Sequence, residues 1–345
     1  MIVDLSIFSA MILIDALNIR NGGGLVLLNY LIKELENTEL NYLVLVNDEN
    51  THSYQNKLHF NGNYLTSRNK FLKECINNYQ PTTLFCFGNF APNFNVKNCK
   101  VIVYVHNSLM AITKKDQNIL LKLNIRNIIK ICYFRIVQKN AQLFLFQKMQ
   151  VLNDFAKFYR IDRTKMKTIP FFDAEQLKLI DTSNKIEDQF IYPSNYSSHK
   201  NHELLICIWE ELAQANCYPK LILTIKAPKK LELKIKFLTK KGLRIENYGE
   251  IPHEKMLALI AESAYCIYPS KVESFGLGLI ESSYLNCEII VLNNIKSEII
   301  YQYVNYYINA ELISQILSNK VDITKKILVQ NKINDLLDEL KTTFR

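Results

Sequence analysis

The feature that most constrains the fold is a regular alternation of short apolar runs with helical patterns, which occurs in two successive series. The runs of the first series are MILID (11–15), YLVLVN (42–47), TLFCFG (83–88), VIVYVH (101–106) and LFLFQ (143–147). Those of the second are FIYPS (190–194), KLILTI (220–225), LRIENYG (243–249), YCIYPS (265–270) and EIIVLN (288–293). Strands that alternate with helices pair in parallel, so the pattern predicts an α/β protein with two parallel sheets covered by helices.

The two series also predict two domains, because 345 residues exceed the usual size of one domain. The helical patterns lie at 25–36, 68–79, 117–139, 203–215, 254–264, 275–285 and 328–344. A polar stretch after MKTIPFFD (166–173) separates the two series. We predict a Rossmann-like domain over 1–172, a second one over 173–320, and a terminal helix over 321–345.

Composition narrows the class of protein. Nine glycines and eight prolines are too few for a disordered chain. The apolar N-terminus contains Asp4 and Asp15 and has no basic region, so we interpret it as a buried strand and not as a signal peptide. The eight cysteines form no C-x-x-C pair, and several lie in apolar runs, which is typical of reduced thiols in a cytoplasmic protein.

The net charge of +9 is unevenly distributed. Residues 1–172 carry 21 Lys/Arg and 11 Asp/Glu, whereas residues 173–345 carry 21 and 22. A basic surplus suits phosphorylated ligands, an anionic membrane or nucleic acid. We found no nucleic-acid motif and no interleaved aromatic residues in the basic region, so we expect no nucleic-acid partner.

Ligands of open parallel sheets bind beyond the carboxyl ends of the strands, which directs attention to the loops there. Gly22, Gly23 and Gly24 follow the first strand and open a helix, where backbone amides can approach an anion. His106 ends the strand at 101–106. A turn that merely packs and a structural histidine explain these two features equally well.

Two loops of the second series carry more chemistry. In YPSNYSSHKNHELL (192–205), Ser194 and Lys200 offer a hydroxyl and an ammonium group to phosphate oxygens. In PSKVESFGLGLIESS (269–283), Glu273 precedes a helix and Glu281 lies about two turns further on, facing back to the loop. The amides that would cap a bound sugar or phosphate belong to Ser274, Phe275 and Gly276.

The segment ESFGLGLIE resembles the E-x(7)-E signature of retaining family-4 glycosyltransferases, and YPSNYSSHKNHELL resembles a loop of one branch of that family. The glycine turn, VIVYVHNSLM and TIPFFD occur in the expected order, so the resemblance covers nearly the whole chain. It implies the GT-B fold, in which two doubly wound Rossmann-like domains face each other across a cleft. It also implies transfer of a sugar from a nucleotide-sugar donor to an acceptor with retention of configuration.

The resemblance assigns the nucleotide part of the donor to four residues. Lys200 would hold the diphosphate, Glu281 would bind the ribose, and Gly23 and Gly24 would approach the phosphates. Ser194 stands where the family often has an arginine, so neutralisation of the diphosphate depends more on Lys200 and on helix termini.

The same resemblance assigns the sugar to the catalytic residues His106 and Glu273. Glu273 would contact sugar hydroxyls, His106 would touch the sugar from the opposite domain, and Phe275 and Gly276 would supply backbone contacts. The sequence contains no D-x-D triplet. We therefore expect no metal and no cofactor, with a UDP- or GDP-linked sugar as the substrate.

A basic helix suggests where the acceptor is found. Lys115, Lys122, Arg126 and Lys130 fall within one arc of the helical pattern at 117–139 and just before it. The alternatives are the solvated face of a packed helix and a dock on an anionic membrane. The second interpretation predicts a peripheral protein on the inner face of the cytoplasmic membrane, acting on a glycan or lipid-linked acceptor in bacterial lipopolysaccharide or capsule synthesis.

Other functions remain open on sequence grounds. A sugar-nucleotide epimerase or a glycosidic phosphorylase would share the GT-B architecture. A protein that binds sugar nucleotides without turnover would share the donor site as well.

Overall fold

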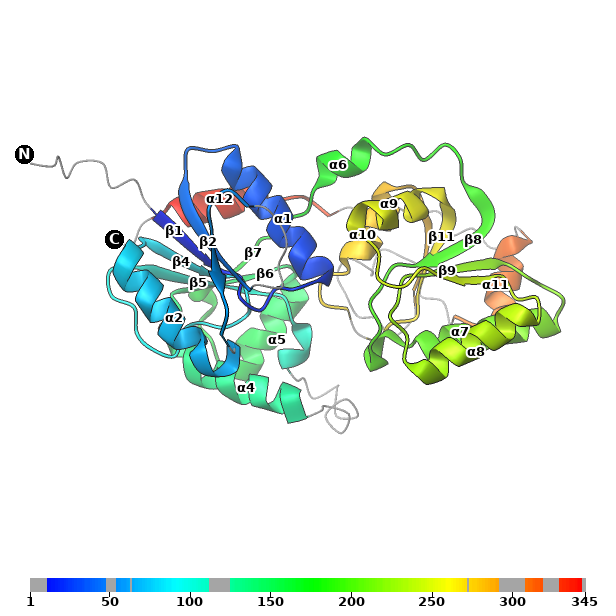
Figure 1. Cartoon of the computed structure of the whole chain (residues 1–345), viewed down its shortest axis with the longest axis horizontal. Coiled ribbons are helices and arrows are strands. Elements are labelled where there is room, and N and C mark those ends of the chain that lie inside the picture. The colour runs from blue at the N-terminus through cyan, green and yellow to red at the C-terminus, as the bar shows by residue number, and fades with distance from the viewer. Residues whose placement is uncertain are drawn as a thin grey trace, which may run out of the picture. The chain divides into compact units, whose positions relative to one another are not determined.

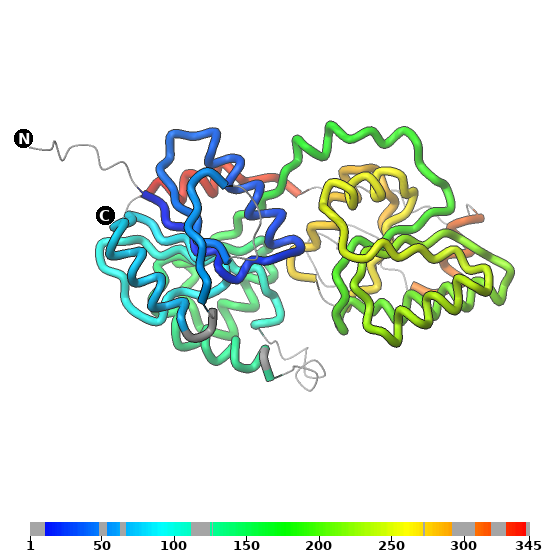
Figure 2. Tube along the Cα trace, viewed as in Figure 1, coloured from blue at the N-terminus to red at the C-terminus, as the bar shows by residue number. Residues whose placement is uncertain are grey.

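The chain forms two compact units in a computed structural model, which describes residues 11–47, 54–62, 64–111, 125–271, 273–291, 308–318 and 329–342 (Figure 1). The first unit comprises Met1–Phe172 together with Gln330–Arg345, and the second comprises Asp173–Val329. Figure 2 shows the C-terminal segment, in red, returning to the unit that holds the blue N-terminal strand.

The first unit is built on a seven-stranded parallel sheet with the order β3-β2-β1-β4-β5-β6-β7. Its strands are β1 (Met11–Asp15), β2 (Asn41–Asn47), β3 (Lys57–Phe60), β4 (Thr83–Cys86), β5 (Lys100–Val105), β6 (Leu143–Phe146) and β7 (Met166–Thr168). The strand order reverses direction between β1 and β4. In sheets of this kind, ligands bind where the order reverses, so loops after β1 and β4 are candidates for a site.

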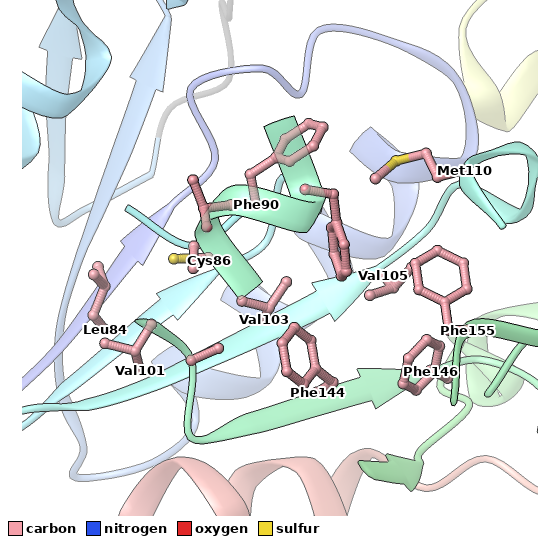
Figure 3. Close-up of a cluster of buried hydrophobic side chains, with 14 of the residues drawn as sticks. Leu84, Cys86, Phe90, Val101, Val103, Val105, Met110, Phe144, Phe146 and Phe155 are labelled. Atoms are coloured by element: carbon pink, nitrogen blue, oxygen red, sulfur yellow. The ribbon is translucent and has the colours of Figure 1, made fainter. Parts of the chain in front are cut away.

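Helices cover both faces of this sheet (Figure 1). They are α1 (Gly22–Glu36), α2 (Tyr64–Tyr79), α4 (Ile125–Val137), α5 (Met149–Tyr159) and α12 (Ile333–Lys341). The core beneath α2, α4 and α5 is rich in aromatic residues, with Phe146 of β6 packed against Phe155 of α5 at 5.3 Å between ring centroids (Figure 3). Such large rings bury much apolar area each and stabilise the unit accordingly.

The C-terminal helix α12 belongs to the first unit through specific bonds. The Lys100 ammonium donates to the Thr342 hydroxyl at 2.6 Å, and the Lys332 amide donates to the Pro170 carbonyl at 2.8 Å. Leu336 and Leu340 of α12 are buried. The terminal helix that the sequence indicates therefore belongs to the first unit and packs on its sheet.

The second unit has a five-stranded parallel sheet with the order β10-β9-β8-β11-β12. Its strands are β8 (Ile186–Tyr192), β9 (Lys220–Leu223), β10 (Ile245–Asn247), β11 (Ser263–Tyr268) and β12 (Glu288–Val291). Its helices are α6 (Ala174–Lys178), α7 (His202–Gln214), α8 (Lys229–Lys240), α9 (His253–Glu262), α10 (Leu277–Tyr284) and α11 (Ala310–Leu317). Here the order reverses between β8 and β11, so the loops that follow these two strands meet. The predicted α/β class with two Rossmann-like domains is confirmed.

Several elements were not anticipated from the pattern. β3 and β7 are short strands at the two edges of the first sheet, where few apolar residues are needed. Helix α8 contains many lysines, so its sequence does not form an obvious apolar run. Leu231, Ile235 and Leu238 nevertheless form a buried stripe at helical spacing.

Candidate functional site

The first unit presents a glycine turn at the carboxyl end of β1. Helix α1 begins at Gly22, which has a φ of 66° and so favours glycine. Gly22 and Gly23 are exposed and Gly24 is half-buried. The first-turn amides of a helix lack partners within the helix. The predicted glycine residues thus form an exposed helix N-terminus of the kind that binds anions.

A buried ion pair behind this turn was missed at the sequence level. The Arg68 guanidinium donates through Nε to Oδ2 of Asp15 at 2.9 Å and through Nη2 to the Phe90 carbonyl at 2.7 Å. Both side chains are almost fully buried. Asp15 also accepts a bond from the Leu17 amide at 3.4 Å. The pair ties α2 to the ends of β1 and β4 and so braces the loop that leads to the glycines.

His106 lies just beyond the end of β5, as expected. Its amide donates to Oδ1 of Asn89 at 2.6 Å, and its ring meets those of Phe87 and Tyr104 edge-on, at 4.4 and 4.8 Å between centroids. Burial lowers the pKa of His106 to about 4, against the opposing effect of a hydrogen bond with the Phe87 backbone. The imidazole is therefore neutral at physiological pH. Within the described part of the chain, Nε2 has no hydrogen-bond partner.

In the second unit, the loops after β8 and β11 are joined by backbone and side-chain bonds. The Lys271 amide donates to the His199 carbonyl at 2.8 Å, and the Asn201 side chain donates to the Pro269 carbonyl at 3.3 Å. The Tyr192 hydroxyl donates to the Lys200 carbonyl at 3.0 Å. The strand order places these loops together, because β8 and β11 are neighbours in the sheet.

Lys200 and Glu273 pair with each other across these two loops. The Lys200 ammonium lies 2.7 Å and 2.9 Å from the two carboxylate oxygens of Glu273. The Lys200 side chain is 19% exposed and that of Glu273 is 6% exposed. Lys200 is predicted to hold the donor diphosphate and Glu273 the donor sugar. Without a donor bound, the two side chains form an ion pair with each other.

Two glycines determine how helix α10 begins and how closely it packs on the sheet. Gly276 precedes the helix with a φ of 74°, in the left-handed region that favours glycine. A Cβ on Gly278 would lie 2.2 Å from the Tyr268 hydroxyl and 3.3 Å from the Pro193 carbonyl oxygen. Glycine at this position lets α10 pack tightly on the ends of β8 and β11. Of the other predicted residues in this turn, Phe275 is buried and Ser274 is half-buried.

Glu281 lies on α10 and is only 3% exposed. Its Oε1 lies 2.7 Å from Nε2 of His253, the first residue of α9. Burial lowers the pKa of His253, but the hydrogen bond with Glu281 and the negative charges of Glu281, Glu254 and Asp173 outweigh it, so that the pKa is raised. His253 is a residue that the sequence analysis does not identify.

Ser194 is buried just beyond the end of β8, where its hydroxyl donates to the carbonyl of Asn195 at 3.2 Å.

The structure describes only some of the basic residues that are predicted to face a membrane. Lys115 and Lys122 lie outside the described residues, as does the side chain of Arg126, whereas Lys130 is exposed on α4.

Helix α4 packs on the core through Phe134 and Val137, but four of its isoleucines are exposed. Ile125 is 73% exposed, Ile128 48% and Ile129 58%. Ile136, further along the helix, is 63% exposed. Helix α4 therefore carries an exposed apolar strip beside Lys130.

Two features are absent from the residues that the structure describes. No group of three or more His, Cys, Asp and Glu side chains is arranged to hold a metal ion. No helix there is both long enough and apolar enough to span a bilayer.

Comparison with known proteins agrees with this architecture. The family model "Glycosyl transferases group 1" matches residues 174–322, which is most of the second unit. A comparison with curated protein sequences gives no match.

Similar solved structures cover nearly the whole chain. HepE of Anabaena, in complex with UDP and glucose, has a TM-score of 0.64 at 14% identity, over 96% of this chain and 98% of that one. Sucrose-phosphate synthase of Thermosynechococcus elongatus has a TM-score of 0.63 at 14% identity, over 96% and 90%. WaaG, a glycosyltransferase of lipopolysaccharide biosynthesis, has a TM-score of 0.61 at 11% identity, over 96% and 90%. The chain therefore has the GT-B fold, and residues 174–322 within its second unit match the group 1 glycosyl transferase model.

Proposed function

We propose that the protein is a retaining glycosyltransferase that moves a sugar from a nucleotide-sugar donor to a glycan or lipid-linked acceptor. The observation that carries the proposal is the pairing of Lys200 with Glu273 across the loops after β8 and β11, followed by Glu281 on helix α10. The Lys200 ammonium lies 2.7 Å from Glu273, and Glu281 follows Glu273 on the adjoining helix. This is a cation and two carboxylates at the end of a sheet, within the group 1 domain.

Each residue has a task that its chemistry suits. Lys200 would neutralise the diphosphate, whose negative charge grows as the bond to the sugar breaks. Glu273 would accept hydrogen bonds from sugar hydroxyls, and Glu281 would accept them from the ribose. The amides around Gly276 and the glycine turn of α1 would add fixed dipoles directed at the phosphates.

The reaction would proceed on one face of the sugar. The acceptor oxygen attacks the anomeric carbon from the side that the diphosphate leaves, and a diphosphate oxygen takes the acceptor proton. His106, a neutral imidazole, would hydrogen-bond the sugar without adding a charge. The protein would act mainly by holding the reactants and stabilising the leaving charge. Lys200 and amide dipoles would take the place of a divalent cation.

The donor would carry UDP or GDP, and the likeness to HepE, which was solved with UDP and glucose, supports UDP. WaaG acts in lipopolysaccharide biosynthesis. These likenesses support a role in bacterial surface polysaccharide assembly.

A membrane surface is the partner that fits helix α4. Isolated isoleucines on a helix surface are ordinary, but Ile125, Ile128 and Ile129 are contiguous and lie beside the exposed Lys130. Apolar side chains enter the interface of a bilayer while basic ones contact anionic headgroups. We propose that this strip docks the protein on the inner face of the cytoplasmic membrane, where lipid-linked acceptors are found.

Mutation of the two carboxylates tests the donor site. Glu281→Ala should weaken nucleotide binding, whereas Glu273→Ala should mainly lower turnover. A lost hydrogen bond to a charged group costs about 1.5–3 kcal/mol, so we expect about a ten- to hundredfold loss in each case. Binding is measured by calorimetry with UDP and GDP, and turnover by release of nucleoside diphosphate that depends on an acceptor.

The same assay separates the alternatives. Nucleotide binding without any acceptor-dependent release would indicate a binding protein. Conversion of the donor sugar without an acceptor would indicate an epimerase, and phosphate-dependent cleavage of a glycoside would indicate a phosphorylase. Rates equal to those of the wild-type protein in both variants would refute the assignment of the site.

A further inference from the structure

The contact between His253 and Glu281 joins two helices that are far apart in the sequence. His253 is the first residue of α9, directly after Pro252, and Glu281 lies in the middle of α10. Nε2 and Oε1 are 2.7 Å apart. Among the residues that the structure describes, His253 is the only side chain that hydrogen-bonds the Glu281 carboxylate.

Local backbone features constrain the two helices that carry these side chains. The backbone of α10 is fixed by the close approach of Gly278 to Tyr268 and Pro193. Pro252 has a φ of −56° and leads directly into α9. The His253 side chain is 25% exposed and that of Glu281 is 4% exposed. A carboxylate this deeply buried needs a partner, because an unpaired buried charge is costly.

We infer that His253 is a positioning residue of the donor site, which holds one oxygen of Glu281 so that the other is presented to the ribose hydroxyls of the nucleotide. The inference rests on the proposed role of Glu281 and adds a residue that the glycosyltransferase signature does not contain. A carboxylate with one oxygen fixed cannot rotate freely, so less orientational freedom is lost when the nucleotide binds.

The charges around His253 give this contact a pH dependence. The groups that act on it are Glu281 on α10, Glu254 on α9, and Asp173 just before α6, and all three are acidic. They hold the pKa of His253 above its ordinary value, so the imidazolium form persists to a higher pH than in a free histidine. A charged donor binds a carboxylate more strongly than a neutral one. Nucleotide affinity should therefore fall as the pH rises through the pKa of His253.

A double-mutant cycle tests the inference with UDP and GDP as probes. His253→Ala should weaken binding of whichever nucleotide the wild-type protein binds, by about tenfold, since a hydrogen bond to a charged group is lost. In the background of Glu281→Ala the same change should have less than a twofold effect. His253→Gln retains a donor and should restore most of the affinity, but its binding should no longer change with pH. Dissociation constants are measured by calorimetry across the neutral pH range.

Controls separate positioning from folding. Lys255→Ala alters an exposed residue on the same helical turn and should change affinity by less than twofold. The Tm of each variant without nucleotide reports on stability alone. An equal loss from His253→Ala in both backgrounds, or a pH dependence that survives in His253→Gln, would overturn the inference while leaving the donor site intact. Wild-type protein that binds neither nucleotide would refute the proposed function and the inference together.

Discussion

Because Lys200 is paired with Glu273, we predict that a substitution of Glu273 strengthens nucleotide binding, whereas loss of a donor-site residue usually weakens it. A diphosphate that binds Lys200 must share its ammonium with a carboxylate already bound through both oxygens, at 2.7 and 2.9 Å. The same carboxylate repels the incoming negative charge. Glu273→Gln removes the charge but keeps the shape, so it should tighten binding of UDP while lowering the rate of sugar transfer.

The size of the effect follows from the burial of the pair. Two unit charges 4 Å apart interact by about 1 kcal/mol in water and by about 4 kcal/mol at an effective dielectric constant of 20. The Lys200 side chain is 19% exposed, so solvent screens part of its charge. We expect a net gain of about 1–2 kcal/mol, which corresponds to a dissociation constant about five- to thirtyfold lower.

Calorimetry with UDP on the wild-type protein, Glu273→Gln, Lys200→Ala and the double variant measures this effect. The gain should disappear in the Lys200→Ala background. A matched control is Glu246→Gln, which breaks the pair between Lys220 and Glu246, 3.0 Å apart at the edge of the same sheet. It should leave the affinity unchanged. If Glu273→Gln weakens UDP binding as much as Lys200→Ala does, Glu273 orients Lys200 and does not compete for it.

Three further predictions concern metal, packing and the membrane. Sugar transfer should survive excess EDTA, because Lys200 and backbone amides are proposed to neutralise the diphosphate; loss of activity that Mg²⁺ or Mn²⁺ restores would contradict this mechanism. Gly278→Ala should destabilise the protein by about 1–3 kcal/mol, seen as a lower Tm, because its Cβ would lie 2.2 Å from the Tyr268 hydroxyl; an unchanged Tm would show that α10 can shift. Replacing Ile128 and Ile129 by Ser and Lys130 by Glu should abolish cosedimentation with anionic liposomes and leave UDP binding unchanged; cosedimentation equal to that of the wild-type protein would exclude α4 as the dock.

The sequence alone predicts the elements of this fold that are encoded locally. Strand β1 (Met11–Asp15) has the limits that the apolar run indicates, and α7 and α10 begin within two residues of the predicted helices. Period and composition report on neighbours in the chain, so they identify buried strands well. They also place Glu273 and Glu281 on either side of a helix start, because a spacing of eight residues across such a turn is itself a local property.

Only the tertiary structure shows which side chains meet. The bond of Lys200 with Glu273 spans 73 residues, that of His253 with Glu281 spans 28, and that of Arg68 with Asp15 spans 53. The return of α12 to the N-terminal sheet spans far more of the chain. These contacts depend on the order of strands in each sheet and on the packing of helices over it. Strand order and helix packing produce no periodic pattern in the sequence, because a contact between two distant segments needs only one suitable residue on each segment.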